Sequence, residues 1–152
     1  MTVAPDGDIA DRADVERLVR AFYGRALTDP VIGYLFVDVA HLDLEAHVPA
    51  ITSFWATILL GEQSYGGGAF APHARLHAKA PLRAGHFKRW LVLWRATVDE
   101  LHTGPRATEA KAHAERVARA FHRRLQGGAD QPGALPVTLE LAVTQHGPAA
   151  DR

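Results

Sequence analysis

The chain has no cysteine and a single methionine among its 152 residues. The absence of cysteine excludes disulfides, thiolate nucleophiles and cysteine-ligated iron–sulfur clusters together, and so says little about redox compartment. An excess of positive charge is missing too, because seventeen basic residues are balanced by seventeen acidic ones. Nucleic-acid binders are typically basic, so we expect no nucleic-acid partner.

Long apolar runs are also lacking. No stretch approaches the roughly 18 apolar residues that a helix needs to span a bilayer. Residues 1–14, MTVAPDGDIADRAD, are acidic and lack the apolar core of a signal peptide. We therefore expect no membrane partner and, by elimination, a cytoplasmic protein.

What is present is the composition of a soluble globular domain, with 47% hydrophobic and 22% charged residues. The length suits one domain with a real core and is short for two. The number of histidines is unusually high: the chain has nine, compared with three tryptophans. Imidazole is the commonest metal ligand among side chains, yet many histidines are simply solvated, so the count alone decides nothing.

Apolar residues recur at helical spacing along most of the chain, and capping and breaking residues separate the periodic segments. The pattern predicts helices at 11–28, 43–60, 72–78, 86–101 and 108–125. We expect an all-α domain over residues 11–128, preceded by a flexible N-terminal arm, 1–10. Residues 129–152 contain the alternating segment PVTLELAV but no partner strand, and we expect a poorly ordered C-terminal extension.

Three histidines stand out by position. His47 falls in the apolar stripe of the 43–60 helix, so the periodicity predicts an imidazole on the buried face. His73 follows Pro72 at the start of a short helix, and His77 lies four residues further on the same face. Such spacing occurs in zinc sites, but two histidines make a weak signal. Hydrogen-bonded core histidines and solvated histidines remain open alternatives.

Several pieces occur together in a fixed order: FYGR at 22–25, a turn ending at Phe36, AHVPAITSFW at 46–55, LLGEQSY at 59–65, HARL from His73, and HFKRWLVLW at 86–94. In this combination the chain resembles the group III truncated haemoglobins of bacteria, over roughly residues 13–126. The resemblance implies a globin-like, two-over-two helical sandwich that holds haem b, an iron protoporphyrin IX. One departure is that Ala69 and Phe70 stand where the family usually has proline and methionine.

Carried over by position, the resemblance makes His73 the proximal ligand of the haem iron, with His77 as the fallback. A neutral imidazole can turn one ring nitrogen to iron while its other N–H bonds a carbonyl. The resemblance assigns the distal ligand pocket to Tyr23, His47, Trp90 and Ile51. Tyr23 and Trp90 can donate hydrogen bonds to a bound diatomic ligand, and His47 can donate or act as a gate.

Further residues are expected around the haem. The aromatic residues expected to pack against it are Phe36, Phe22, Trp55 and Phe87. Arg75 and Lys79 are the cations expected near the haem propionates. Each of these residues also has an ordinary interpretation, in the core for the aromatic rings and in solvent for the cations.

The resemblance predicts reversible binding of dioxygen and other diatomic ligands, nitric oxide and carbon monoxide among them. Detoxification of nitric oxide or peroxide would add an enzymatic role, and it would require an external reductase. One alternative is a zinc or other non-haem metal site formed by His73, His77 and a carboxylate such as Glu62. The other is a cofactor-free helical interaction module.

Overall fold

A computed structural model describes residues 7–127 of the chain, so the predicted C-terminal extension, 129–152, lies outside the described residues. Between residues 7 and 127 all regular elements are helical, which confirms the expected all-α class. The elements are α1 (Arg12–Ala26), the π-helical segment η1 (Leu35–Val39), α2 (Leu44–Leu60), α3 (Phe70–Lys79), α4 (Ala84–Leu101) and α5 (Pro105–Leu125). No helix in this range is both long and apolar enough to cross a membrane.

Local capping sets the ends of two helices as the sequence predicts. The Asp11 carboxylate accepts a hydrogen bond from the backbone N–H of Asp14 at 3.0 Å and so begins α1. Asp43 begins α2 through a bond from the N–H of Ala46 at 3.3 Å. Gly61 ends α2 with φ of 76°, a left-handed conformation that glycine adopts without steric cost.

The start of α5 differs from the prediction. The helix was predicted over 108–125, yet it begins three residues earlier at Pro105, whose missing N–H is not needed in the first turn. The Asp8 carboxylate accepts bonds at 2.9 Å from the N–H groups of Arg106 and Ala107 and so caps the helix from far along the sequence. A Cβ at Gly104 would lie 2.6 Å from the Asp8 side chain, so only glycine permits this approach.

Residues 7–10 are therefore not part of a free arm. The Ile9 side chain is 1% exposed and belongs to the core. Burial opposes ionisation of Asp8, but the backbone N–H donors of Arg106, Ala107 and Ile9 outweigh it and lower the pKa of this carboxyl. For these four residues the expectation of a flexible N-terminal segment is wrong, because a helix cap and a buried isoleucine tie them to α5.

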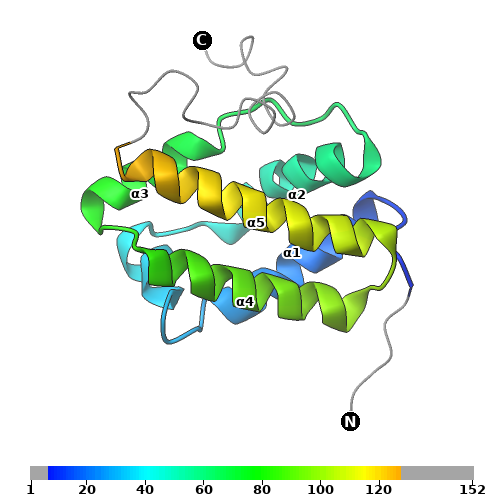
Figure 1. Cartoon of the computed structure of the whole chain (residues 1–152), viewed down its shortest axis with the longest axis horizontal. Helices are drawn as coiled ribbons and strands as arrows, with labels where there is room; N and C mark the ends of the chain where they lie inside the picture. Colours follow the sequence, from blue (N-terminus) through cyan, green and yellow to red (C-terminus); the bar gives the residue numbers. More distant parts are fainter. Residues whose placement is uncertain (1–6, 128–152) are drawn as a thin grey trace.

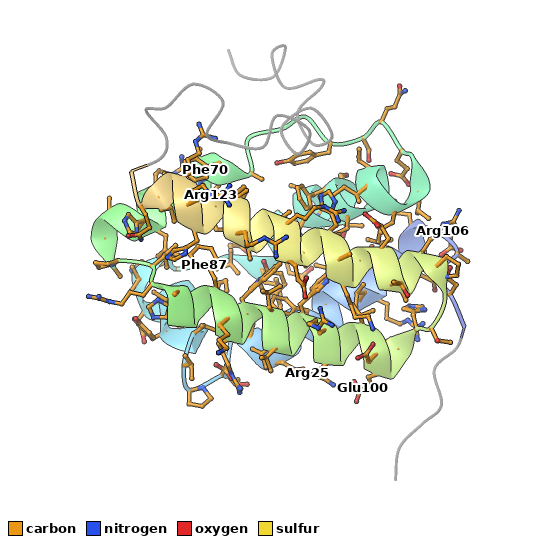
Figure 2. The ribbon with its side chains drawn as sticks, in the orientation of Figure 1. Arg25, Phe70, Phe87, Glu100, Arg106 and Arg123 are labelled. Atoms are coloured by element: carbon orange, nitrogen blue, oxygen red, sulfur yellow. The ribbon has the colours of Figure 1, made fainter. Side chains whose placement is uncertain are left out.

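The helices form two packed pairs. α1 packs on α2 and α4 packs on α5, while contacts of α1 with α4 and of α2 with α5 join the pairs. Figure 1 shows α4 and α5 side by side in opposite directions, with α1 and α2 behind them. Arg25 of α1 also forms an ion pair with Glu100 of α4, seen at the lower edge of Figure 2. The short helix α3 lies at one end, against α5 and η1.

His113 of α5 is buried between the helix pairs. Its ring meets the edges of Phe54 and Trp55, with centroids 6.4 and 6.0 Å away, and its Nε2 has no hydrogen-bond partner among the described residues. Burial, reinforced by the Arg116 guanidinium, lowers the pKa of His113 to about 4. The imidazole is therefore neutral in the folded protein at neutral pH.

The titration of His113 predicts a loss of stability in weak acid. The unfolded chain takes up a proton near pH 6.5 and the folded chain only near pH 4, so the free energy of unfolding falls between these values. The total loss at this residue is roughly 3 kcal/mol. Urea unfolding between pH 4 and 7 should show a flatter profile for His113→Gln than for the parent. The exposed His47→Gln variant is the control, and parallel profiles for His113→Gln and the parent would refute the assignment.

Candidate functional site

A cleft of about 640 Å³, counted to its open mouth, lies where α1, η1, α3, α4 and α5 meet. The residues that line it are Tyr23, Ile32, Leu35, Phe36, His73, Leu76, Leu82, His86, Phe87, Trp90, Val117, Ala118 and Phe121. Most of this wall is apolar, with histidine, tyrosine and tryptophan as its hydrogen-bonding groups.

Five of the predicted site residues meet at this cleft, although they come from four different elements. They are Tyr23, Phe36, His73, Phe87 and Trp90. Phe87 is labelled in Figure 2 on α4, at the same end of the molecule as Phe70 of α3. The structure thus brings these five positions together at one cleft, and their roles stay predictions.

His73 is held in one tautomer. Its Nδ1 donates a hydrogen bond to the carbonyl oxygen of Ala69 at 2.8 Å, and its ring packs on Phe121 with centroids 4.9 Å apart. Burial lowers the pKa of His73 despite the opposing effect of the Ala69 carbonyl, so the ring is neutral at physiological pH. The unprotonated Nε2 therefore keeps its lone pair, which is the form of imidazole that binds a metal.

His77, the fallback ligand, is already engaged elsewhere. Its Nδ1 accepts a hydrogen bond from the backbone N–H of Leu82 at 2.9 Å, which stabilises the loop between α3 and α4. The residue does not line the cleft. The structure therefore favours His73 over His77 as the histidine that could hold a cofactor.

Tyr23 and Trp90 bring unused hydrogen-bond donors to the cleft. Within residues 7–127 neither the Tyr23 hydroxyl nor the Trp90 indole N–H has a hydrogen-bond partner. Burial raises the pKa of Tyr23 to about 12, so its O–H keeps the proton at neutral pH. Both residues are half-buried, and two free donors at the wall of one cleft are suited to a polar ligand.

Four other predicted residues are not at the cleft. His47 is exposed, with its Nδ1 2.8 Å from the Asp43 carbonyl oxygen, so its expected place on the buried face of α2 is wrong. Ile51 is half-buried on the same flank of the helix. The stripe that α2 buries runs through Val48 instead, one residue and about 100° further round the helix.

Phe22 lies directly behind the cleft wall, and Trp55 lies further from it. Phe22 is 1% exposed and contacts Tyr23 and Trp90, with ring centroids 5.1 and 5.9 Å away. Trp55 is 3% exposed and stacks on Trp94. Phe22 thus supports two rings that line the cleft, whereas Trp55 lies deeper in the core, behind Trp94.

His86 is the polar cleft residue that the sequence interpretation missed. It lies four residues before Trp90, so both side chains share one face of α4, and that spacing was the available signal. Its Nδ1 accepts from the N–H of Arg83 at 2.9 Å, which leaves the proton on Nε2, 3.4 Å from the Tyr34 hydroxyl oxygen. Burial and the Arg83 cation lower the pKa of His86.

The elements that form the cleft carry exposed positive charges. Six arginines and lysines on α3, α4, α5 and the loop before α4 are exposed and form no ion pair with a carboxylate among residues 7–127: Arg75, Lys79, Arg83, Lys88, Arg119 and Arg123. Arg123 is labelled in Figure 2 near Phe70, at the cleft end of α5. The predicted propionate residues Arg75 and Lys79 belong to this set, which favours anionic groups at the rim of the cleft.

The zinc alternative finds no support in the geometry. Between residues 7 and 127 there is no group of three or more histidines, cysteines or acidic residues placed to hold a metal ion. Glu62, its proposed carboxylate, forms an ion pair with Arg12 at 2.8 Å. With His77 bound to the Leu82 N–H, the three predicted zinc ligands are not assembled.

A buried ion pair fixes the loop between α1 and η1. The Asp29 side chain, 3% exposed, accepts bonds from Arg89 of α4 at 2.9 and 2.7 Å and from the N–H groups of Val31 and Ile32. A Cβ at Gly33 would lie 2.7 Å from the carbonyl oxygen of Leu27, so the loop closes tightly only with glycine there. Ile32 and the start of η1 are thereby placed at the cleft.

Comparisons with known proteins agree with this arrangement. The chain is 24% identical over 118 residues to the group 3 truncated haemoglobin ctb of Campylobacter jejuni, a match that covers 76% of this chain and 91% of that protein. It also resembles the crystal structure of the group III truncated haemoglobin from Campylobacter jejuni, with a TM-score of 0.67 and 23% identity over 82% of this chain and 95% of that one. No family model matches the chain.

These two findings confirm the resemblance read from the sequence. The structural likeness shows that the fold of this chain is that of the truncated globins, as expected. The fold is therefore the globin-like helical sandwich, and the cleft between its helices is the candidate site.

The ion pair of Asp29 should stabilise the loop beside the cleft less in acid than at neutral pH. The Arg89 guanidinium lowers the pKa of Asp29 against the opposing effect of burial. The contribution of Asp29 to the free energy of unfolding is therefore present above about pH 4 and is lost as the pH falls through the lowered pKa of the folded state. Asp29→Asn should lower the free energy of unfolding at pH 7 by about 2 kcal/mol, with a smaller difference below pH 3. Denaturant melts at both pH values check this, with exposed Asp38→Asn as control. Equal stability of Asp29→Asn and the parent at pH 7 would refute it.

Proposed function

We propose that this chain, which has the truncated-globin fold, is a haem-binding globin of the group III type that reversibly binds dioxygen and other diatomic ligands in the cleft. The observation that carries the proposal is a neutral imidazole at the cleft with Nδ1 bound to a carbonyl and Nε2 free. Haem needs one such ligand from the protein, unlike zinc, which needs three or four. A b-type haem, held without covalent attachment, fits a chain that contains no cysteine.

The protein's part is to bind and orient the group. His73 would hold the iron through Nε2, with the Ala69 carbonyl fixing the plane of the ring. Phe36, Phe87 and Phe121 offer apolar faces at the cleft for the macrocycle, and Phe22 supports the Tyr23 and Trp90 rings of that wall from behind. Arg75 and Lys79 would meet the propionates at the rim. When bound, the haem supplies the coordination position for diatomic ligands and one-electron redox chemistry.

Tyr23 and Trp90 would donate hydrogen bonds to the distal ligand. Bound dioxygen carries partial negative charge, and donors in a site shielded from water stabilise that charge more strongly than donors in water do. The high pKa of Tyr23 keeps its O–H available at all physiological pH values. Strong donors slow release of dioxygen, which suits redox chemistry or sensing better than bulk transport.

The structure gives no support of its own to the proposed roles of His47 and Ile51. Their distal roles rest on the resemblance alone, because neither lines the cleft. His47 would act as a gate only if its exposed side chain swung inward. The globin domain, predicted over 11–128, is proposed to begin at residue 7, because the Asp8 cap and the buried Ile9 belong to it.

The same pocket would support redox reactions of two kinds. Dioxygen in the cleft could oxidise nitric oxide to nitrate, and polar donors beside a peroxide could assist cleavage of its O–O bond. Both reactions need electrons that must come from a separate reductase. The chain is therefore proposed as a ligand-binding haem protein in the cytoplasm, with nitric oxide or peroxide detoxification as its candidate chemistry.

A haem titration of two histidine variants tests the ligand assignment. His73→Ala removes the free Nε2 and should lose tight haem binding and the five-coordinate ferrous spectrum. His77→Ala is the matched control on the same helix and should keep both. Hemin uptake followed at the Soret band, then reduction, measures the two properties. Survival of the five-coordinate ferrous spectrum in His73→Ala, with its loss in His77→Ala, would transfer the ligand role to His77.

Removing one distal donor should speed dioxygen release. Tyr23→Phe and Trp90→Phe each delete one hydrogen bond, and a bond of about 1–2 kcal/mol corresponds to an off-rate roughly 5–30 times faster. Stopped-flow displacement of dioxygen by carbon monoxide measures the rate. Tyr34→Phe, which removes a phenol outside the cleft lining, is the control. Off-rates equal to that of the parent would rule out the donor roles.

A further inference from the structure

The three tryptophans of the chain form one continuous stack. Trp90 lines the cleft and lies parallel to Trp94, with an interplanar angle of 4° and centroids 6.0 Å apart. Trp94 in turn stacks on Trp55 of α2 at 4.6 Å and 21°. The stack thus crosses the core from the cleft to the helix on the opposite side of the fold.

Core packing alone does not require this arrangement. Aromatic rings in protein cores commonly meet edge to face, and most ring contacts in this chain do so, including those of Phe22 with Trp90 and Trp94. Among the ring pairs of residues 7–127, only the indoles stack nearly parallel. Indole is, with phenol, the side-chain ring most readily oxidised by one electron. Parallel overlap of such rings favours electron exchange between neighbours.

Hydrogen bonding favours one direction of electron transfer along the stack. The Trp94 indole N–H donates to the Ala110 carbonyl oxygen at 3.1 Å, whereas the Trp90 N–H has no partner among residues 7–127. Loss of an electron makes an indole N–H a stronger donor, so a carbonyl beside it stabilises the oxidised ring. Trp94 should therefore give up an electron more easily than Trp90, and oxidation that begins at Trp90 should pass inward.

The surroundings of Trp55, at the inner end of the stack, do not oppose the passage of oxidation from Trp90 inward. The ring beside Trp55 on α5 is His113, which is neutral because burial lowers its pKa to about 4, so it adds no positive charge next to an oxidised Trp55. Phe54 also contacts Trp55 and separates it from Tyr65, with centroids 5.2 and 5.3 Å apart in turn. Trp55 is thus the last indole of the path.

We propose that Trp90, Trp94 and Trp55 form an electron relay that carries electrons from the α2 side of the protein to an oxidant reacting in the cleft. The relay rests on the proposed haem function, because it assumes that a hydroperoxide reacts at the cofactor. Its role is to remove oxidising equivalents from the site before they damage the cofactor and the cleft residues.

The electrons and protons balance as follows. Cleavage of the O–O bond of a hydroperoxide, ROOH, to ROH and water takes two electrons and two protons. Trp90 supplies each electron withdrawn at the cleft. Trp94 then passes an electron to the oxidised Trp90, and Trp55 passes one to the oxidised Trp94. A small one-electron reductant such as ascorbate then reduces the oxidised Trp55. Two ascorbate anions become two ascorbyl radicals and release the two electrons and the two protons.

The experiment compares two variants of the middle residue. Trp94→Phe and Trp94→Tyr place six-membered rings of nearly equal size at this position, but only tyrosine is readily oxidised. The haem-loaded proteins are treated with hydrogen peroxide, frozen rapidly for electron paramagnetic resonance, and digested to locate oxidised residues by mass spectrometry. The Soret band before peroxide reports haem loading, and its decay reports bleaching.

The parent protein should give an indole radical and oxidised Trp55. In Trp94→Phe oxidation of Trp55 should be lost and bleaching should be faster, while Trp94→Tyr should regain oxidation at Trp55 or at the new tyrosine. If both variants load haem and oxidise Trp55 as the parent does, or if Phe and Tyr behave alike, the relay is overturned. A protein that takes up no haem overturns the proposed function and the relay together, and the missing Soret band distinguishes that result.

Discussion

The site depends on one hydrogen bond, from Nδ1 of His73 to the carbonyl oxygen of Ala69. That bond sets the tautomer and the plane of the imidazole, and burial keeps the ring uncharged. A ring nitrogen with a free lone pair is thereby presented on α3, a helix of 10 residues at the end of the molecule. The Phe121 ring packs against the imidazole, and the Tyr23 and Trp90 donors, which have no partner between residues 7 and 127, give the cleft its polar character.

Long-range polar contacts hold the walls of this cleft in place. Asp29 joins the loop before η1 to Arg89 of α4, and Asp8 caps the distant start of α5. These contacts bring together elements that supply one or a few cleft residues each. Behind the wall, the indole stack from Trp90 to Trp55 connects the cleft to the core, so the packing that stabilises the fold also offers a path for electrons.

The helices were largely predictable because their signals are local, as the caps at Asp11 and Asp43 and the glycine at 61 show. The Asp8 cap was not predictable, since its partners lie some 98 positions away and only the folded chain brings them together. His47 was misplaced because a step of one residue turns a helix by about 100°, and apolar spacing alone did not separate it from Val48. His73, Tyr23 and Trp90 were found through the order of motifs, not through periodicity, and their meeting at one cleft is a tertiary fact.

The central claim is that a single neutral imidazole in this cleft holds haem. The most direct test is the visible absorption spectrum of the purified full-length protein as isolated, after reduction, and under carbon monoxide. The account predicts an intense Soret band that shifts on reduction and again on binding carbon monoxide. A protein that stays colourless, even after addition of hemin, would contradict it.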